Sequence, residues 1–532
     1  MERVRRPYAT ARSATALTVL SGLSPAAGVV VEMALAWRFG ASATVDAFRI
    51  SVLVVLVGQQ LFVLLPNVIV PVFAAYRAKR AESEAWEAAL SAANLLVVPP
   101  AVLALIVFVR PEPVVHLLGP GLDREGARSA VFFVRWFMVA CVPLVWSGII
   151  AGVLAAYDIF WLPAASQLLG NMVLVGMIVL FGRDWGGTSL VVGVLIASVA
   201  SWALFLARLA ALMHDVGVRP TGWFSARHPG VGHALRLGLP VLGAVLIGQW
   251  TAAVINRVLS HLEVGTLATF GYAWKMGQMV SLFPGALAAV LLPRFAESWH
   301  SSREGEFRET CTKALRMALF LALPTTCVFF VLRRPIVMLL FERGEFAAEA
   351  GDAVARLFGL LLLGAPGLVA FVYIQKMFYA VQAMWVPFWT QLGVAVLWTV
   401  LAPAVAARFA ADGVALMCAA LTWISCGALL VLLHRMYGSL SMKELAVFSA
   451  KVGPLAVISA LLGGQGANVI QRFSGSGTWS LTVTIAAGVG LASVIFYGVT
   501  VRWRFPEALE SQRYLHWQRG AMRSRLQSAL HR

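Results

Sequence analysis

The residues of this chain that are most able to do chemistry are charged side chains inside, or at the ends of, long apolar segments. They are Glu32, Asp46, Arg49, Arg135 and Lys275. A charge in hydrocarbon costs several kcal/mol unless it is paired or faces water, so such residues mark candidate sites for charged ligands. Arginine can hold a phosphate through two parallel hydrogen bonds, whereas lysine acts as a point charge. Arg49 and Lys275 are therefore the candidate ligands of an anionic group.

Uncharged polar side chains accompany these charges in three of the apolar segments. They are Gln59, Gln60, Asn67, Gln249, Asn256 and Gln278. We expect them to face a polar interior together with Glu32 and Asp46. A second interpretation stays open for the arginines: Arg49 and Arg135 extend to the outer membrane surface, and Glu32 pairs with one of them.

The composition indicates that lipid is the solvent of these segments. Of the 532 residues 60% are hydrophobic and 13% are charged, with a mean hydropathy of +0.81, whereas soluble domains are about 25% charged. Runs of about 18 or more apolar residues are long enough to cross a bilayer as helices. We predict about fourteen spans: 14–37, 46–74, 86–109, 129–155, 161–181, 188–213, 236–260, 267–292, 313–332, 353–376, 385–406, 412–434, 448–470 and 479–501.

The distribution of charge and an internal repeat predict how the spans are arranged. An even number of spans places both termini on one membrane side, and most of the 42 lysine and arginine residues fall on that side, which makes it cytoplasmic. The segment that begins at Trp161 recurs at Trp385 as a W-x-P-x-x-x-Q-L pattern. Since this offset covers six spans, the two halves enter the membrane in the same direction.

The predicted fold class is therefore an all-α polytopic membrane protein with two parallel six-helix lobes plus two extra C-terminal helices. The predicted domains are an N-terminal lobe at 1–215, a C-terminal lobe at 216–440, transmembrane helices 13 and 14 at 441–505, and a basic cytoplasmic tail at 506–532. This architecture suits alternating access, in which the lobes rock around a central cavity.

Other classes of function find little support in the sequence. There is no Walker A loop, no cluster with metal-ligand spacing and no Ser/His/Asp constellation, so we expect neither an enzyme nor a cofactor or metal. The net charge of +17 reflects membrane orientation rather than nucleic-acid binding. The five cysteines include no CxxC pair and are predicted to be small buried hydrophobic residues.

Several motifs resemble the MurJ/MviN lipid II flippase family of the MOP superfamily. The segment from Phe39 to Phe48 is similar to that family's first-loop signature, and Pro71 to Lys79 resembles its exit from helix 2. The segment from Tyr272 to Pro293 resembles its helix 8. Phe341 to Phe346 and Phe378 to Gln382 resemble patterns of its second lobe.

The chain departs from the family where the resemblance implies basic residues in the central cavity. The helix 1 position is Val31, followed by Glu32, and the helix 2 position is Gln59 or Gln60. Helix 8 keeps a cation at Lys275, but Trp274 replaces the preceding acid. The loss of two cations weakens the expected binding of pyrophosphate unless Arg49 substitutes for them.

The resemblance implies a flippase that moves an undecaprenyl-pyrophosphate-linked peptidoglycan precursor (lipid II) across the bacterial cytoplasmic membrane by alternating access. Lys275 and Arg49 would hold the phosphates, while Glu32, Asp46 and the Gln/Asn set contact sugar or gate the lobes. One alternative is a flippase for another polyprenyl-linked oligosaccharide, of exopolysaccharide or O-antigen type. A cation-coupled drug exporter is a second alternative, and a non-transporting scaffold that binds partners is a third. The expected partners are the polyprenyl-pyrophosphate-linked saccharide, membrane lipid and proteins of cell-envelope synthesis, without nucleic acid.

Overall fold

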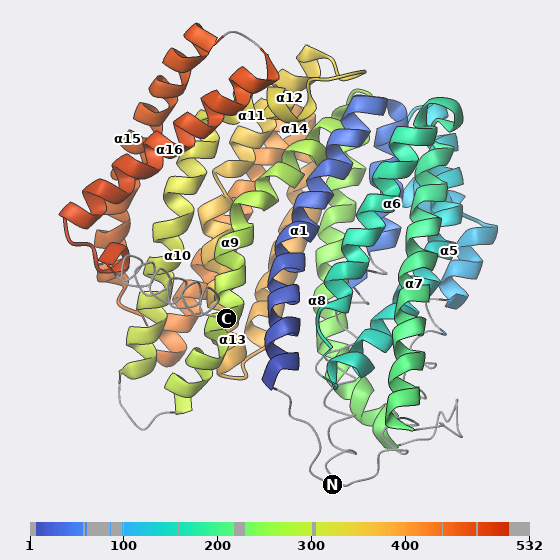
Figure 1. Cartoon of the computed structure of the whole chain (residues 1–532), viewed down its shortest axis with the longest axis horizontal. Helices are drawn as coiled ribbons and strands as arrows, with labels where there is room; N and C mark the ends of the chain where they lie inside the picture. The colour runs from blue at the N-terminus through green and yellow to red at the C-terminus, as the bar shows by residue number, and fades with distance from the viewer. Residues whose placement is uncertain are drawn as a thin grey trace, which may run out of the picture. The chain divides into compact units, whose positions relative to one another are not determined.

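The structure of the chain is a computed structural model. It describes residues 7–56, 59–60, 86, 98, 101–157, 159–217, 229–300, 305–438, 440–474 and 477–509. These residues form helices joined by short connections (Figure 1). Helices are expected here because a backbone in hydrocarbon must satisfy its N–H and C=O groups within its own segment. The prediction of an all-α polytopic membrane protein is confirmed.

The helices follow one another along the whole described chain. They are α1 (Pro7–Phe39), α4 (Glu112–Leu118), α5 (Arg124–Ala155), α6 (Leu162–Trp185), α7 (Thr188–Val216), α8 (Pro229–Leu259), α9 (Thr266–His300), α10 (Glu306–Val331), α11 (Arg333–Phe341), α12 (Ala348–Leu362), α13 (Ala365–Ala380), α14 (Trp385–Tyr437), α15 (Met442–Ser474) and α16 (Thr478–Arg502). Residues 43–56 and 101–109 are also helical.

Most of the described helices coincide with predicted spans, whereas the short α4 and α11 lie between them. More than half of each of the predicted spans 46–74 and 86–109 lies outside the described residues. Seven of the described helices are long and apolar enough to cross a membrane, or nine if each of two bent pairs forms one span. One such pair is α12 and α13, bent by 43° inside the predicted span 353–376. Helix α14 contains two predicted spans, which meet at Ala410, where the backbone leaves the helical region (φ 49°, ψ −145°). The total of fourteen spans stays a prediction.

Contacts divide the chain into two compact units. Unit 1 comprises Met1–Lys275, Phe341–Ala353 and Gln391–Val414, and unit 2 comprises Met276–Leu340, Val354–Thr390 and Ala415–Arg532. Within unit 1, α1 packs on α6, α6 on α7 and α7 on α5. Within unit 2, α10 packs on α13, α15 and α16. The division into six-helix lobes at 1–215 and 216–440 stays a prediction.

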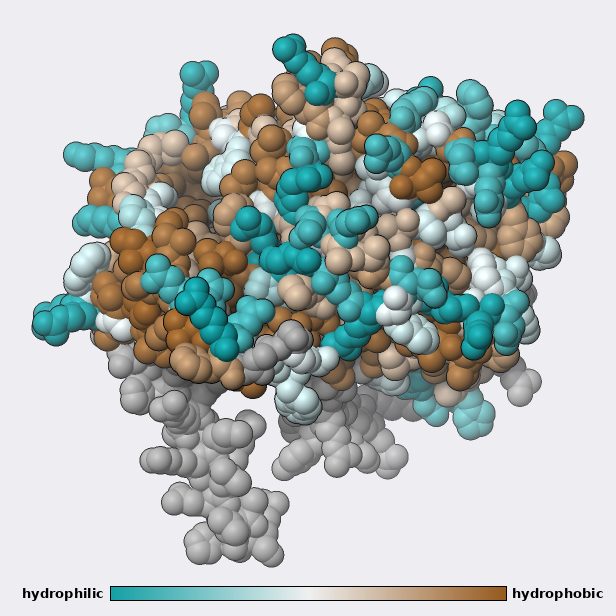
Figure 2. All heavy atoms as spheres, turned by 90° about the horizontal axis from the view of Figure 1, so that it is seen from above, coloured by the Kyte–Doolittle hydropathy of each residue, from teal (hydrophilic) through white to brown (hydrophobic). Residues whose placement is uncertain are grey.

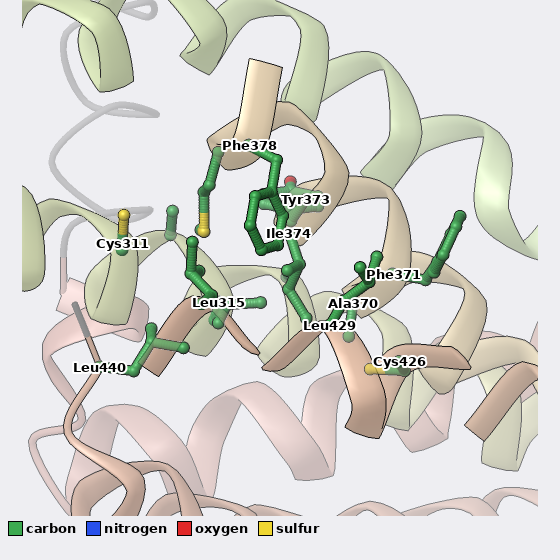
Figure 3. Packing of buried hydrophobic residues seen from close by; sticks show 14 of the residues in the cluster. Cys311, Leu315, Ala370, Phe371, Tyr373, Ile374, Phe378, Cys426, Leu429 and Leu440 are labelled. Carbon is green, nitrogen blue, oxygen red and sulfur yellow. The ribbon is translucent and has the colours of Figure 1, made fainter. Parts of the chain in front are cut away.

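A buried cluster joins three helices of unit 2 (Figure 3). Cys311 and Leu315 of α10 lie among Tyr373 and Phe378 of α13 and Leu429 of α14. All five cysteines of the chain are free thiols, and four of them are buried. Four cysteines therefore agree with the prediction of small buried hydrophobic residues, whereas Cys327 is only partly buried.

Large apolar side chains also cover much of the surface. Leu180 is 70% exposed on α6, Val494 is 70% exposed on α16, and many other leucine, valine and tryptophan residues are similarly open. Brown, hydrophobic residues are visible on the surface in Figure 2. Soluble monomers rarely expose so much contiguous apolar surface, so these faces are suited to lipid contact.

Candidate functional site

Several loops of unit 1 meet at one end of its helices. Gly40, which follows α1, has a φ of +59°, and a Cβ built there would lie 2.6 Å from the Glu345 carbonyl oxygen. Glu345 N donates to the Trp37 carbonyl oxygen at 3.0 Å. Gly121 N donates to Ser260 Oγ at 3.2 Å. The predicted order of spans requires these loops to share one membrane side, and the contacts agree with that order.

Asp46 caps the N-terminus of α9. Its Oδ2 accepts the N–H of Gly265 at 2.5 Å and its Oδ1 accepts the N–H of Ala268 at 2.7 Å. The first N–H groups of a helix have no partner within the helix, and a carboxylate there also opposes the helix dipole favourably. Asp46 is only 4% exposed, so both of its oxygens are committed to this contact. It ties the start of the helix at 43–56 to the start of α9.

We expect Asp46→Asn to loosen the start of α9. The amide keeps one oxygen acceptor but directs an NH2 group at the second N–H, which costs about 1–3 kcal/mol for a buried unsatisfied donor. Hydrogen–deuterium exchange of residues 265–268 in purified protein measures the effect. The matched control is Asp123→Asn, because Asp123 caps α5 through Gly126 N at 2.9 Å but is exposed. Equal protection losses at the two caps would contradict the burial argument.

Arg49 is paired with Glu32. Arg49 Nη1 donates to Glu32 Oε1 at 3.0 Å, and Nη2 donates to Oε2. The two side chains are only 13% and 10% exposed. The guanidinium also lies over the Tyr272 ring, 5.0 Å from its centroid. Glu32 therefore pairs with an arginine, as the second interpretation expects, and neutralises the charge of Arg49. Arg49 is nevertheless largely buried by this pairing and does not extend to a surface, so that part of the interpretation is wrong.

The backbone of α9 packs closely against the Glu32–Arg49 pair. A Cβ built on Gly271 would lie 2.7 Å from Arg49 Cζ, so the guanidinium packs directly against α9. The buried Arg49 Nε has no hydrogen-bond partner among the described residues. Tyr272 Oη donates to the Gly40 carbonyl oxygen at 3.0 Å, and Asn256 Nδ2 donates to the Arg49 carbonyl oxygen at 3.4 Å. Arg49 is thus held by α1, α8 and α9.

Lys275 lies in a second, separate polar environment. A Cβ built on Gly28 of α1 would be 3.2 Å from Lys275 Nζ and 3.9 Å from Asn171 Nδ2, so both nitrogens approach the same point. Asn171 Nδ2 donates to the Ser24 carbonyl oxygen at 3.3 Å, and Ser24 Oγ is buried without a described partner. None of the ion pairs formed by the described residues includes Lys275.

The position of Lys275 along α9 is also significant. It lies nine residues after Thr266, the first residue of α9, which corresponds to about 14 Å along the helix axis. Lys275 Nζ and Asn171 Nδ2 approach one point beside Gly28 of α1, where an anion is the complementary ligand.

The remaining predicted site residues are spread more widely. Gln249 Oε1 is buried without a partner among the described residues, and Gln278 of α9 is exposed. Gln59 and Gln60 are helical and exposed. Asn67 lies outside the described residues. A role in substrate binding stays a prediction for each of them.

Arg135 belongs to the surface rather than to the site. Its Nη2 lies 4.0 Å from Glu112 Oε1, and the two side chains are 40% and 62% exposed. Such exposed pairs contribute little to stability. This placement agrees with the interpretation in which Arg135 extends to the membrane surface.

Three neighbours of the charged residues were not predicted from the sequence. Asn171 is an isolated amide within the apolar α6, the same signal that identified Asn256. Ser24 and Tyr272 carry no comparable signal, because hydroxyl groups are common in membrane helices and often bond to their own backbone. The described residues contain no group of three or more His, Cys, Asp or Glu side chains that could hold a metal ion.

The arrangement of helices is a multi-span membrane fold that is also found in solved structures. A solved structure titled lipid II flippase MurJ, inward closed conformation, matches 92% of this chain and 98% of its own, with a TM-score of 0.75 and 18% identity. An inward-facing MATE family multidrug resistance transporter of the MOP superfamily matches 77% of this chain and 93% of its own, with a TM-score of 0.64 and 15% identity. These likenesses establish the fold.

The sequence establishes the family within this class. Residues 35–488 match the family model of the lipid II flippase MurJ. The chain belongs to the MurJ family, and it is accordingly a transporter and not an enzyme. The predicted family, transporter class and multi-pass membrane location are confirmed.

Individual relatives are divergent. The probable lipid II flippase MurJ of Rhizobium tropici is 28% identical over 362 residues, which cover 64% of each chain. The protein of the same description from Thermotoga maritima is 25% identical over 376 residues, which cover 69% of this chain and 73% of that protein. The first of these matches thus spans slightly less than two thirds of the relative's length.

Proposed function

We propose that this chain translocates lipid II from the cytoplasmic to the outer leaflet of the bacterial cytoplasmic membrane. The observation that carries the proposal is the group formed by Lys275, Asn171 and Ser24. The nitrogens of Lys275 and Asn171 approach the same point beside Gly28, and Asn171 also donates to the Ser24 carbonyl oxygen. Within a family of lipid II flippases, the pyrophosphate of the substrate is the anion suited to this group. Lys275 supplies its charge and Asn171 a directional hydrogen bond.

In this proposal Arg49 is the second residue that binds the phosphates. To do so, it must exchange its contact with Glu32 for a contact with phosphate. Glu32 neutralises Arg49 in the present arrangement, so a phosphate can bind only by displacing the carboxylate or by sharing the guanidinium with it. Such an exchange between two anions keeps the buried cation paired throughout the cycle, which avoids the large cost of an unpaired charge.

Alternating access gives Asp46 a role on the outer side. With both termini in the cytoplasm, the loops around Gly40, Gly121 and Gly265 face outward. The Asp46 contact with α9 then stabilises their closed arrangement, and its release accompanies opening to the outer leaflet. The membrane potential can contribute about 2.3 kcal/mol per charge per 100 mV to the movement of an anionic substrate.

The substrate itself can be tested by complementation. The full chain is expressed in a bacterium whose own lipid II flippase is repressed, and growth is followed together with the amount of protein in the membrane. We expect growth to be restored. Restoration of surface polysaccharide in a strain that lacks an exopolysaccharide flippase, without rescue of the first strain, would instead favour another polyprenyl-linked oligosaccharide.

A further inference from the structure

An apolar groove lies on the face of α8 that is turned away from Arg49. It has a volume of about 560 Å³ and is formed within unit 1 by α4, α8, α14 and the residues after α8. Leu117, Ala253 and Pro403 are among its apolar lining residues. Trp250 Nε1 donates to Thr399 Oγ1 at 3.0 Å across the groove. The size falls within the range of ligand pockets, about 300–1,000 Å³.

The length of the groove matches one leaflet of a bilayer. Trp250 and Val258 of α8 both line it, and this stretch of helix is about 12 Å long at about 1.5 Å per residue. His261, in the turn after α8, extends the groove further. The hydrocarbon core of a bilayer is about 30 Å thick. A lipid acyl chain of one leaflet therefore fits the groove lengthwise, whereas the undecaprenyl tail of the proposed substrate is far longer than the groove.

Positive charge lies at the end of the groove that is next to the 260–265 loop. Arg257 is exposed, and its Nη1 donates to the Leu117 carbonyl oxygen at 2.9 Å, so other N–H groups of the guanidinium are available to a ligand. His261 is exposed beside it. No carboxylate is among the lining residues of this part of the structure. An apolar channel that ends in a cation at headgroup depth is complementary to a phospholipid.

We propose that this groove binds an anionic glycerophospholipid, with an acyl chain along α8 and the phosphate at Arg257 and His261. The lipid comes from the leaflet on the side of the 260–265 loop, which is the outer leaflet in the predicted topology. The bound lipid packs against α8 on the side opposite to Asn256, whose Nδ2 donates to the Arg49 carbonyl oxygen at 3.4 Å. The site does not depend on the identity of the transported substrate.

Native mass spectrometry of the purified full-length protein with added phosphatidylglycerol tests this proposal. Ala253→Phe fills the groove without changing charge, and Arg257→Ala removes the cation. We expect each to lower phosphatidylglycerol retention by about fivefold or more. The exposed Arg128→Ala on α5 is the charge-matched control and should retain lipid like the wild type.

Competition between added lipids shows which kind of lipid occupies the groove. Phosphatidylcholine and undecaprenyl phosphate should each displace phosphatidylglycerol poorly from the wild type. Equal retention by the wild type, Ala253→Phe and Arg257→Ala would overturn the proposal. So would stronger binding of undecaprenyl phosphate that is lost in the same two variants. Because the two variants act on shape and on charge separately, a folding defect in one leaves the other informative.

Discussion

Lys275→Gln is expected to weaken the affinity of the purified protein for lipid II by about 30-fold or more. Removal of one partner of a buried, hydrogen-bonded charge pair costs about 2–5 kcal/mol, and about 1.4 kcal/mol corresponds to a tenfold change in Kd. Lys275→Arg keeps the cation and should bind within a few-fold of the wild type. The measurement is the Kd for lipid II in detergent solution.

The matched control for this prediction is Lys451→Gln. Lys451 is an exposed lysine on α15 and should leave the Kd unchanged. Asn171→Leu removes the neighbouring amide without a change in charge and should give a smaller loss than Lys275→Gln. If Lys275→Gln binds lipid II as tightly as the wild type, Lys275 does not hold the pyrophosphate.

The Glu32–Arg49 pair is expected to show strong energetic coupling. Arg49→Ala leaves Glu32 buried and unpaired, and Glu32→Ala does the same to Arg49, so each change should cost about 3–5 kcal/mol of stability. Replacement of both residues by apolar side chains, Glu32→Leu with Arg49→Met, should recover most of this loss. Equilibrium unfolding in detergent measures the four free energies of the double-mutant cycle.

An exposed ion pair provides the reference cycle. Lys313 and Glu309 on α10 are 67% and 65% exposed, and such pairs couple by less than about 1 kcal/mol. Similar coupling in the two cycles would contradict the burial argument for Glu32 and Arg49. The apolar double variant also tests function: if it is stable and binds lipid II normally, Arg49 is a structural residue and not a phosphate ligand.

The positions of the helices could be predicted from the sequence because lipid imposes a simple rule. A segment that crosses hydrocarbon must be apolar and must satisfy its own backbone, and both requirements are visible in one sequence. The break at Ala410 lies in the gap between the predicted spans 385–406 and 412–434, and Pro366 lies in the first turn of α13, beside the bend. The sequence does not show the angle of the bend, nor that a single residue replaces a loop at the break.

The partners of the charged residues could not be decided from the sequence. Whether Arg49 faces Glu32, lipid or a ligand depends on how α1 and the helix at 43–56 are rotated about their axes. The Asp46 contact joins residues 219 positions apart in the chain, so only the fold brings them together. Lys275 was recognised as a cation within an apolar helix, but its neighbour Asn171 was not recognised, although both are polar residues within apolar helices.

Transport of lipid II itself tests the central claim most directly. The full-length protein is reconstituted in liposomes with fluorescent lipid II or with a fluorescent undecaprenyl-pyrophosphate-linked oligosaccharide of another type, and the fraction that reaches the opposite leaflet is followed over time. We expect rapid translocation of lipid II by the wild type and a rate near that of empty liposomes for Lys275→Gln. Translocation of the other lipid alone, or the same lipid II rate for the wild type and empty liposomes, would contradict it.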